Sequence, residues 1–143
     1  LKANGNAADS DVDFLEEAIE VAPKLSPLYA TLARCYIGWE DRDTALEVVD
    51  EGINKVGKHP QLLLIKSQIL WLQNEKDTAF QHLNEGIQLY PNDVSLLTQI
   101  ARYLIDNEQL EDAKPYIERA DIIAPSHGAL WELKKIIAEK MAR

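Results

Sequence analysis

The sequence predicts an all-α fold, a solenoid of stacked antiparallel helix hairpins. Turn-forming residues recur every 34 residues along the chain, at Pro23, Gly57, Pro91 and Pro125. Two further series of small residues keep the same period: Ala45, Ala79 and Ala113, and Gly52, Gly86 and Ala120. A fixed period of this length is typical of stacked repeats, in which each helical unit buries its apolar face on the next.

The first helix is predicted over residues 11–22, after a small and polar lead-in at residues 1–10. Its apolar side chains follow three- and four-residue steps, which place them on one stripe: Phe14, Leu15, Ala18, Ile19 and Ala22. Pro23 ends this helix because it has no N–H to donate and clashes with the preceding turn. Ser26 is a candidate N-cap before Pro27, and a second helix is expected from Pro27 to Gly38.

Each later unit repeats this order of helix, tight turn, helix and turn. Asp43 is expected to cap the helix that runs to Val56, and Asp77 and Glu111 hold the same register in the next two units. A carboxylate at the start of a helix interacts favourably with the positive end of the helix dipole.

Three places depart from the period. Lys66 stands where its register mates are Leu32 and Ile100, so its charged head must extend out of a buried face. Pro115 is expected to delay or kink the helix that contains it. For the final helix, over residues 128–141, a one-residue shift of register directs three side chains inward: Leu130, Leu133 and Ile137.

The three full units resemble the tetratricopeptide repeat (TPR), a helix pair of 34 residues with the pattern W-x2-L-G-x2-Y, A-x3-F and P. The first unit matches at seven positions: Tyr29, Leu32, Ala33, Tyr36, Ala45, Val49 and Gly57. The second unit matches in part, through Leu63, Ser67, Leu70, Ala79, Leu83 and Pro91. The third carries Leu97, Ile100, Ala101, Leu104, Ala113, Ile117 and Pro125. The resemblance covers residues 11–143.

We expect residues 1–143 to form a single TPR domain with five segments. An incomplete repeat contributes its second helix at 11–25, and full repeats follow at 26–59, 60–93 and 94–127. A C-terminal capping helix occupies 128–143. Because the chain opens at Leu1 without Met, we expect a fragment of a larger protein.

The resemblance implies a right-handed superhelix whose first helices line a concave groove for a partner peptide or helix. Projection of those helices gives a set of candidate partner-binding residues: Thr31, Arg34, Ile37, Leu64, Ile65, Gln68, Trp71, Thr98, Gln99, Arg102 and Ile105. Arg34 and Arg102 could bind a carboxylate or peptide carbonyls, and Trp71 could supply an aromatic anchor. The alternative is that both arginines pair with local acids and Trp71 packs between helices.

One TPR subclass clamps the terminal carboxylate of chaperone peptides with Lys and Asn side chains. The corresponding positions here hold Ala30, Arg34, Ile65, Ser95 and Gln99, so this clamp is absent.

No pattern of catalytic residues emerges. His82 and Glu85 share a helix face without an evident third ligand, and Cys35 has no His nearby in sequence. The chain contains neither a phosphate-binding glycine loop nor a G-x-S-x-G motif. We therefore predict that the protein is not an enzyme and has no cofactor or metal site.

The net charge of −9 disfavours nucleic acid as a partner, and no apolar run is long enough for membrane insertion. We expect a soluble domain, in the cytoplasm or the periplasm, that binds a protein or peptide. Two alternatives remain open. The chain could be a spacer or docking arm appended to an enzyme or a membrane-export or assembly machine. It could also self-associate, as a homodimer through the truncated N-terminal end that exposes Phe14 and Leu15.

Overall fold

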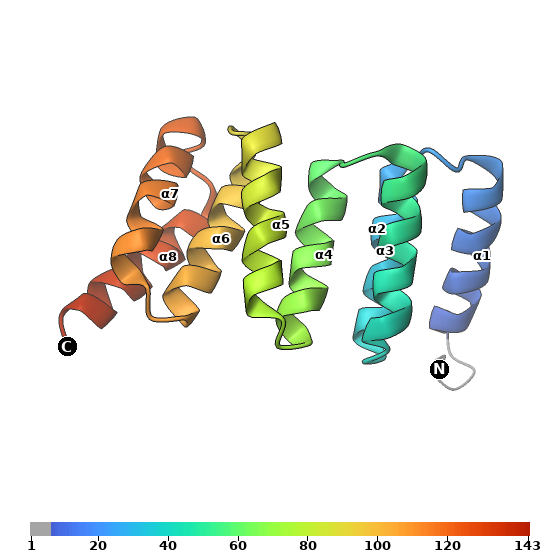
Figure 1. The fold of residues 1–143 in the computed structure, drawn as a ribbon, viewed down its shortest axis with the longest axis horizontal. Coiled ribbons are helices and arrows are strands. Elements are labelled where there is room, and N and C mark those ends of the chain that lie inside the picture. Colours follow the sequence, from blue (N-terminus) through green and yellow to red (C-terminus); the bar gives the residue numbers. More distant parts are fainter. Residues whose placement is uncertain (1–6) are drawn as a thin grey trace. The chain divides into compact units, whose positions relative to one another are not determined.

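The computed structural model describes residues 7–143, with side chains described from Ser10 onward, and every regular element in this range is an α-helix (Figure 1). This confirms the all-α prediction. The eight helices of the described range are α1 (Ala7–Val21), α2 (Ser26–Gly38), α3 (Arg42–Val56), α4 (Pro60–Leu72), α5 (Lys76–Leu89), α6 (Val94–Asp106), α7 (Leu110–Ile123) and α8 (Gly128–Met141).

The chain forms two compact units, with the division after His82, inside α5. In unit 1, α2 contacts α1, α3 and α4, and α3 also contacts α4. In unit 2, α6 and α7 form a hairpin, and α8 packs against both of them. The predicted repeat bounds and the assignment of the chain to a single domain stay predictions from the sequence.

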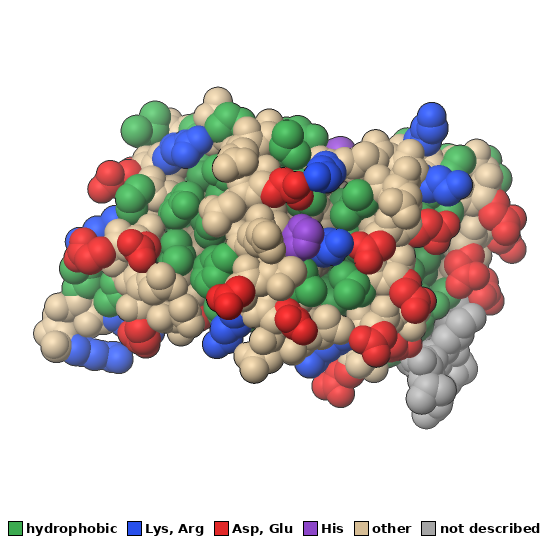
Figure 2. All heavy atoms as spheres, in the orientation of Figure 1, with side chains coloured by type: hydrophobic (Ala, Val, Ile, Leu, Met, Phe, Trp, Pro, Cys, Tyr) green, Lys and Arg blue, Asp and Glu red, His purple; other side chains and the backbone are tan. Residues whose placement is uncertain are grey.

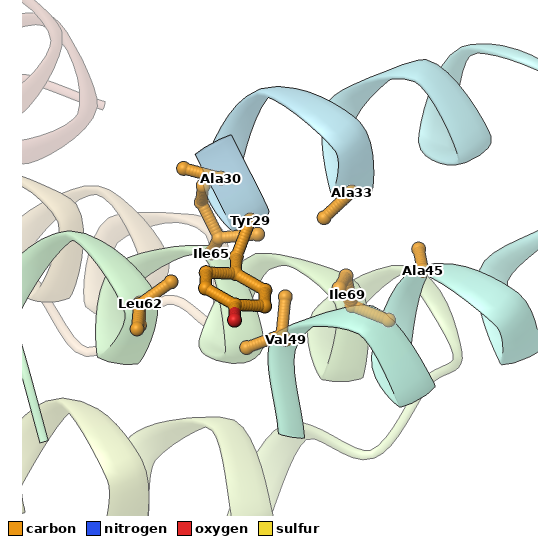
Figure 3. Packing of buried hydrophobic residues seen from close by; sticks show 8 residues of the cluster. All are labelled: Tyr29, Ala30, Ala33, Ala45, Val49, Leu62, Ile65 and Ile69. Carbon is orange, nitrogen blue, oxygen red and sulfur yellow. The ribbon is translucent and has the colours of Figure 1, made fainter. Parts of the chain in front are cut away.

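The core of unit 1 lies where α2, α3 and α4 meet (Figure 3). Tyr29 is at its centre, 1% exposed, and its hydroxyl donates a hydrogen bond of 2.6 Å to the carbonyl of Pro23. Around it lie side chains from all three helices: Ala30, Ala33, Ala45, Val49, Leu62, Ile65 and Ile69. Small residues at the crossing allow the helices to approach closely, as the sequence predicts.

Unit 2 buries the corresponding side chains. On α6 and α7 these are Leu97, Ile100, Ala101, Leu104, Ala113, Ile117 and Ala120. On α8 the buried side chains are Leu130, Leu133 and Ile137, which confirms the one-residue shift of register in the last helix.

The turn inside each hairpin contains a residue with positive φ, again spaced by 34 residues: Glu40 (61°), Asn74 (63°) and Glu108 (60°). At the first of these turns, the N–H of Asp41 donates to the carbonyl of Tyr36 and that of Glu40 donates to Ile37. The other two turns repeat both bonds. This is the Schellman motif, which satisfies the last carbonyls of a helix and favours a left-handed residue after its C-cap.

Four sequence expectations require correction. Residues 7–10 belong to α1 rather than to a lead-in, whereas residues 1–6 lie outside the described range. The N-cap of α2 is Leu25, with Ser26 as the first helical residue. The cap of α3 is Asp41, which accepts from the Thr44 N–H at 3.3 Å, and Asp43 lies in the first turn. Hydrogen bonds from Thr44 lower the pKa of Asp41.

The fourth correction concerns the delayed helix start expected at Pro115, while the kink stays a prediction. The helix is not delayed by it, because α7 begins at Leu110 and continues through the proline to Ile123. Pro115 cannot donate to the carbonyl four residues earlier, but buried Ala113 and Ile117 on either side hold α7 in the core. Lys66 behaves as predicted: its ammonium leaves the buried face and meets Asp50 at 2.7 Å.

Candidate functional site

The predicted binding residues of unit 1 lie on two neighbouring first helices, α2 and α4, which are in contact. We call their accessible side chains the α2–α4 surface: Thr31, Arg34, Ile37, Leu64, Gln68 and Trp71. Thr31 and Arg34 are exposed, and the other four are partly exposed. Residues 34 apart hold equivalent positions on the first helices of adjacent repeats. Arg34 of α2 is therefore equivalent to Gln68 of α4, and Ile37 of α2 is equivalent to Trp71 of α4, one turn further along each helix.

Trp71 is held in place from one side. Its ring makes an edge-to-face contact with Phe80 on α5, with centroids 5.6 Å apart and planes at 87°. The ammonium of Lys76 lies 5.0 Å from the ring centroid, a cation–π contact. The expectation that Trp71 packs between helices is therefore met on that side, while part of the ring remains accessible. A fixed, partly exposed indole costs little conformational entropy on binding.

Arg34 is the exposed cation of this surface. Among the described residues, none forms an ion pair or hydrogen bond with its side chain. Within the described side chains, which begin at Ser10, Arg34 therefore has no acid partner, and the local-acid alternative stays a prediction for this residue. A guanidinium without a partner in residues 10–143, on a chain of net charge −9, has the chemistry to bind a carboxylate or peptide carbonyls.

Three predicted residues are buried instead of lining a surface: Ile65 (0% exposed), Thr98 (8%) and Ile105 (2%). Ile65 belongs to the core around Tyr29. The Thr98 hydroxyl donates to the carbonyl of Val94 at 2.9 Å, inside its own helix. Helical projection counted these positions as facing the groove, but their side chains turn into the packing between helices, where a partner does not touch them directly.

In unit 2, Gln99 and Arg102 on α6 are partly exposed. One guanidinium nitrogen of Arg102 lies 3.8 Å from a carboxylate oxygen of Glu132 on α8, so the local-acid alternative holds for this arginine. Next to it, burial raises the pKa of Tyr103 to about 12, and the charge of Asp106 adds to the shift. Continuation of the α2–α4 surface onto α6 stays a prediction.

A pocket of about 200 Å³ lies between α1 and α2, lined by Asp11, Phe14, Leu15, Thr31 and Cys35. Thr31 and the exposed side chain of Phe14 line the same pocket, which the sequence pattern did not predict. Cys35 is partly buried there, and burial, with a smaller contribution from Asp11, raises the pKa of its thiol. The thiol is therefore less reactive than an ordinary cysteine. Leu15 is 8% exposed, which corrects the expectation that it lies open beside Phe14.

Over residues 7–143, no three His, Cys, Asp or Glu side chains gather as a metal site. In the same range, no helix is both long enough and apolar enough to cross a bilayer.

No protein-family model matches the chain. Among curated proteins it is similar to the HTH-type transcriptional regulator MalT of Yersinia enterocolitica, with 27% identity over 101 residues that cover 66% of this chain and 11% of the regulator. MalT of Yersinia pestis (strain Pestoides F) is 25% identical over the same length. The chain thus spans about a ninth of the length of these curated relatives.

Solved structures share the fold. A thermophilic TPR protein of Thermus thermophilus, TTC0263, superposes with a TM-score of 0.79 at 16% identity, over 95% of this chain and 74% of its own. MamA gives 0.73 at 13% identity, over 94% and 79%. YrrB, described as a TPR protein with an unusual peptide-binding site, gives 0.63 at 18% identity, over 95% and 71%. The chain therefore has the TPR fold that its repeats resemble.

Proposed function

We propose that this protein is a non-catalytic scaffold that binds a peptide or helix of a partner protein on the α2–α4 surface. The observation that carries the proposal is the exposed guanidinium of Arg34, which has no partner among the described residues, on the same surface as the partly exposed ring of Trp71. A charged fork beside a fixed aromatic ring is the composition of a binding hot spot.

The chemistry of this surface defines the ligand class. Arg34 suits a carboxylate or two peptide carbonyls, and Gln68 on the neighbouring helix supplies amide groups at the same level. Trp71, with Ile37 beside it, suits an apolar side chain one turn further along. The expected ligand is therefore a segment with an acidic residue followed, at a spacing of about one helical turn, by an aliphatic or aromatic residue. The description of YrrB as peptide-binding supports a peptide ligand.

A peptide library displayed on phage tests this proposal. We expect the wild-type protein to select peptides that combine an acidic and an apolar residue. The variant Arg34→Glu should lose at least tenfold in affinity for them, measured by fluorescence anisotropy of a labelled selected peptide. Because Arg34 is exposed and has no partner among the described residues, its replacement should leave the fold intact.

Lys24→Glu is the matched control, since it changes the net charge by the same amount in the exposed loop between α1 and α2. It should bind the peptide as the wild type does. Trp71→Phe should weaken binding while keeping an aromatic contact to Phe80. Selected peptides that bind Arg34→Glu as tightly as the wild type would place the binding site on another face.

A further inference from the structure

Lys76, the first residue of α5, lies beside the α2–α4 surface. Its side chain is exposed, and its ammonium lies 5.0 Å from the ring centroid of Trp71. Glu75 and Asp77 flank it in the sequence, but neither forms an ion pair with it, and no other acid within residues 10–143 does. Lys76 is therefore a cation that is held in place by an aromatic ring and not by a carboxylate.

The position of Lys76 is unfavourable for the fold itself. A cation in the first turn of a helix is repelled by the positive end of the helix dipole. Arg42 holds the equivalent position one period earlier, at the start of α3, and there the guanidinium has a structural partner: its Nη1 donates to the carbonyl of Leu72 at 2.8 Å. Within the described residues the ammonium of Lys76 makes no hydrogen bond. A local preference that is broken with only a cation–π contact in return favours a functional role.

Arg34, Trp71 and Lys76 follow one another along the surface. Arg34 is equivalent to Gln68 of α4, and Trp71 lies one turn further along α4. Helix α4 ends next to Trp71, and residues 73–75 turn the chain into α5, which starts with Lys76 (Figure 1). A segment that binds along α4 therefore meets a guanidinium, an indole and an ammonium in that order.

The rest of unit 1 is acidic. Helix α1 contains no Lys or Arg, and Figure 2 shows Asp and Glu side chains over α1 and α3 with few basic side chains among them. Acidic groups of a ligand are repelled by such a surface and are attracted only where a cation has no carboxylate of its own. The positions of Arg34 and Lys76 therefore determine where along a bound segment its acidic residues can lie.

We propose that the ligand of the α2–α4 surface carries a second acidic side chain and that Lys76 binds it. This inference rests on the proposed function, in which Arg34 binds one acid and Trp71 an apolar residue. The second acid flanks that apolar residue on the side opposite to the first acid. An ammonium has three N–H donors, so it can bind a carboxylate while it keeps its contact with the indole ring.

Parallel selections from the phage-displayed library test the inference with the wild type, Lys76→Glu and Lys135→Glu. Lys135 is the matched control, because its ammonium makes a similar cation–π contact, 5.3 Å from the ring centroid of Trp131, on α8 of unit 2. The wild type and Lys135→Glu should select acids on both sides of the apolar residue. Lys76→Glu should keep the first acid and select Lys or Arg in place of the second.

Lys76→Glu should remain folded, which circular dichroism melting checks, because a carboxylate at the start of a helix favours the helix dipole. Fluorescence anisotropy of a selected peptide with blocked termini measures the size of the effect. Replacement of its second acid by the corresponding amide should lower the affinity of the wild type about two- to fivefold, as for an exposed ion pair. The same replacement should leave the affinity of Lys76→Gln unchanged.

Equal losses in the wild type and in Lys76→Gln overturn the inference. So does a wild-type selection without an acid at the second position, or a selection by Lys76→Glu that matches the wild type. Selected peptides that bind Arg34→Glu as tightly as the wild type count instead against the proposed function, so the two failures are distinguishable.

Discussion

Gly52 on α3 lies directly against the ring of Tyr29. A Cβ placed on it would be 2.8 Å from Cγ of Tyr29 and 2.9 Å from its Cβ, closer than carbon atoms pack. The ring is poorly able to retreat, since it is 1% exposed and its hydroxyl is bound to the Pro23 carbonyl. The period of the chain thus reflects a packing constraint at single residues: a large side chain on the first helix meets glycine on the second.

We expect Gly52→Ala to lower the free energy of unfolding by about 1–3 kcal/mol, because overpacking outweighs the gain of about 1 kcal/mol in helix propensity. Urea denaturation followed by circular dichroism measures the change. Combination with Tyr29→Leu should recover part of the loss, since Leu97 holds the position of Tyr29 where Ala120 replaces glycine.

Gly38→Ala is the control for propensity alone. Gly38 ends α2, and a Cβ there meets nothing within 4 Å. This variant should be neutral or more stable by up to about 1 kcal/mol. A Gly52→Ala protein as stable as the wild type would show that Tyr29 shifts to accommodate the methyl group.

At the scale of the element, each hairpin turns through a left-handed residue, and two of the three are glutamates. A left-handed residue with a Cβ costs about 1–2 kcal/mol, which glycine avoids. We expect Glu40→Gly to raise the free energy of unfolding by about 0.5–1 kcal/mol, after the added flexibility of the unfolded chain is subtracted. Thermal melting of the purified variant tests this.

Glu47→Gly provides the opposite control, since Glu47 is an exposed residue in the middle of α3. The same replacement there should destabilise the protein by about 1 kcal/mol. Equal losses at both positions would mean that the turn stores no backbone strain. Glu108 is less suitable for this test because it also pairs with Lys140 at 2.9 Å.

The helices themselves were predictable from sequence because proline, glycine and apolar spacing act locally. Gly38, Val56 and Met141 end their helices as predicted. The caps were less predictable, since Asp41 and Asp43 are both suitable carboxylates and the preceding Schellman turn decides which one reaches the free N–H groups. Residue spacing carries no information on that turn.

The sequence predicted which helices carry the candidate residues, but not which of these residues are accessible. The period correctly identified which residues lie on first helices, and Arg34, Gln68 and Trp71 are accessible. It did not separate Ile65, Thr98 and Ile105, which are buried. Whether a side chain at the edge of a helix face turns inward depends on the sizes of its neighbours on other helices. Partner binding by these residues stays a prediction.

At the scale of the whole molecule, the alkaline limit of stability should depend on Tyr103. Its pKa is about 12 in the folded protein, against about 10 in an unfolded chain. Between these values the folded state keeps a proton that the unfolded state has lost. Stability is therefore complete below pH 10 and falls as pH rises through 12, by about 2 kcal/mol from this residue.

The comparison with Tyr103→Phe isolates this contribution, since all other groups titrate equally in both proteins. Urea unfolding at pH 9, 10, 11 and 12 should give a steeper loss of stability for the wild type than for the variant. In an alkaline titration followed by tyrosinate absorbance at 295 nm, Tyr103→Phe should lack one tyrosine that ionises late in the wild type. Parallel stability profiles for the two proteins would show that folding does not raise the pKa of Tyr103. Water would then have to reach the Tyr103 hydroxyl in the folded protein.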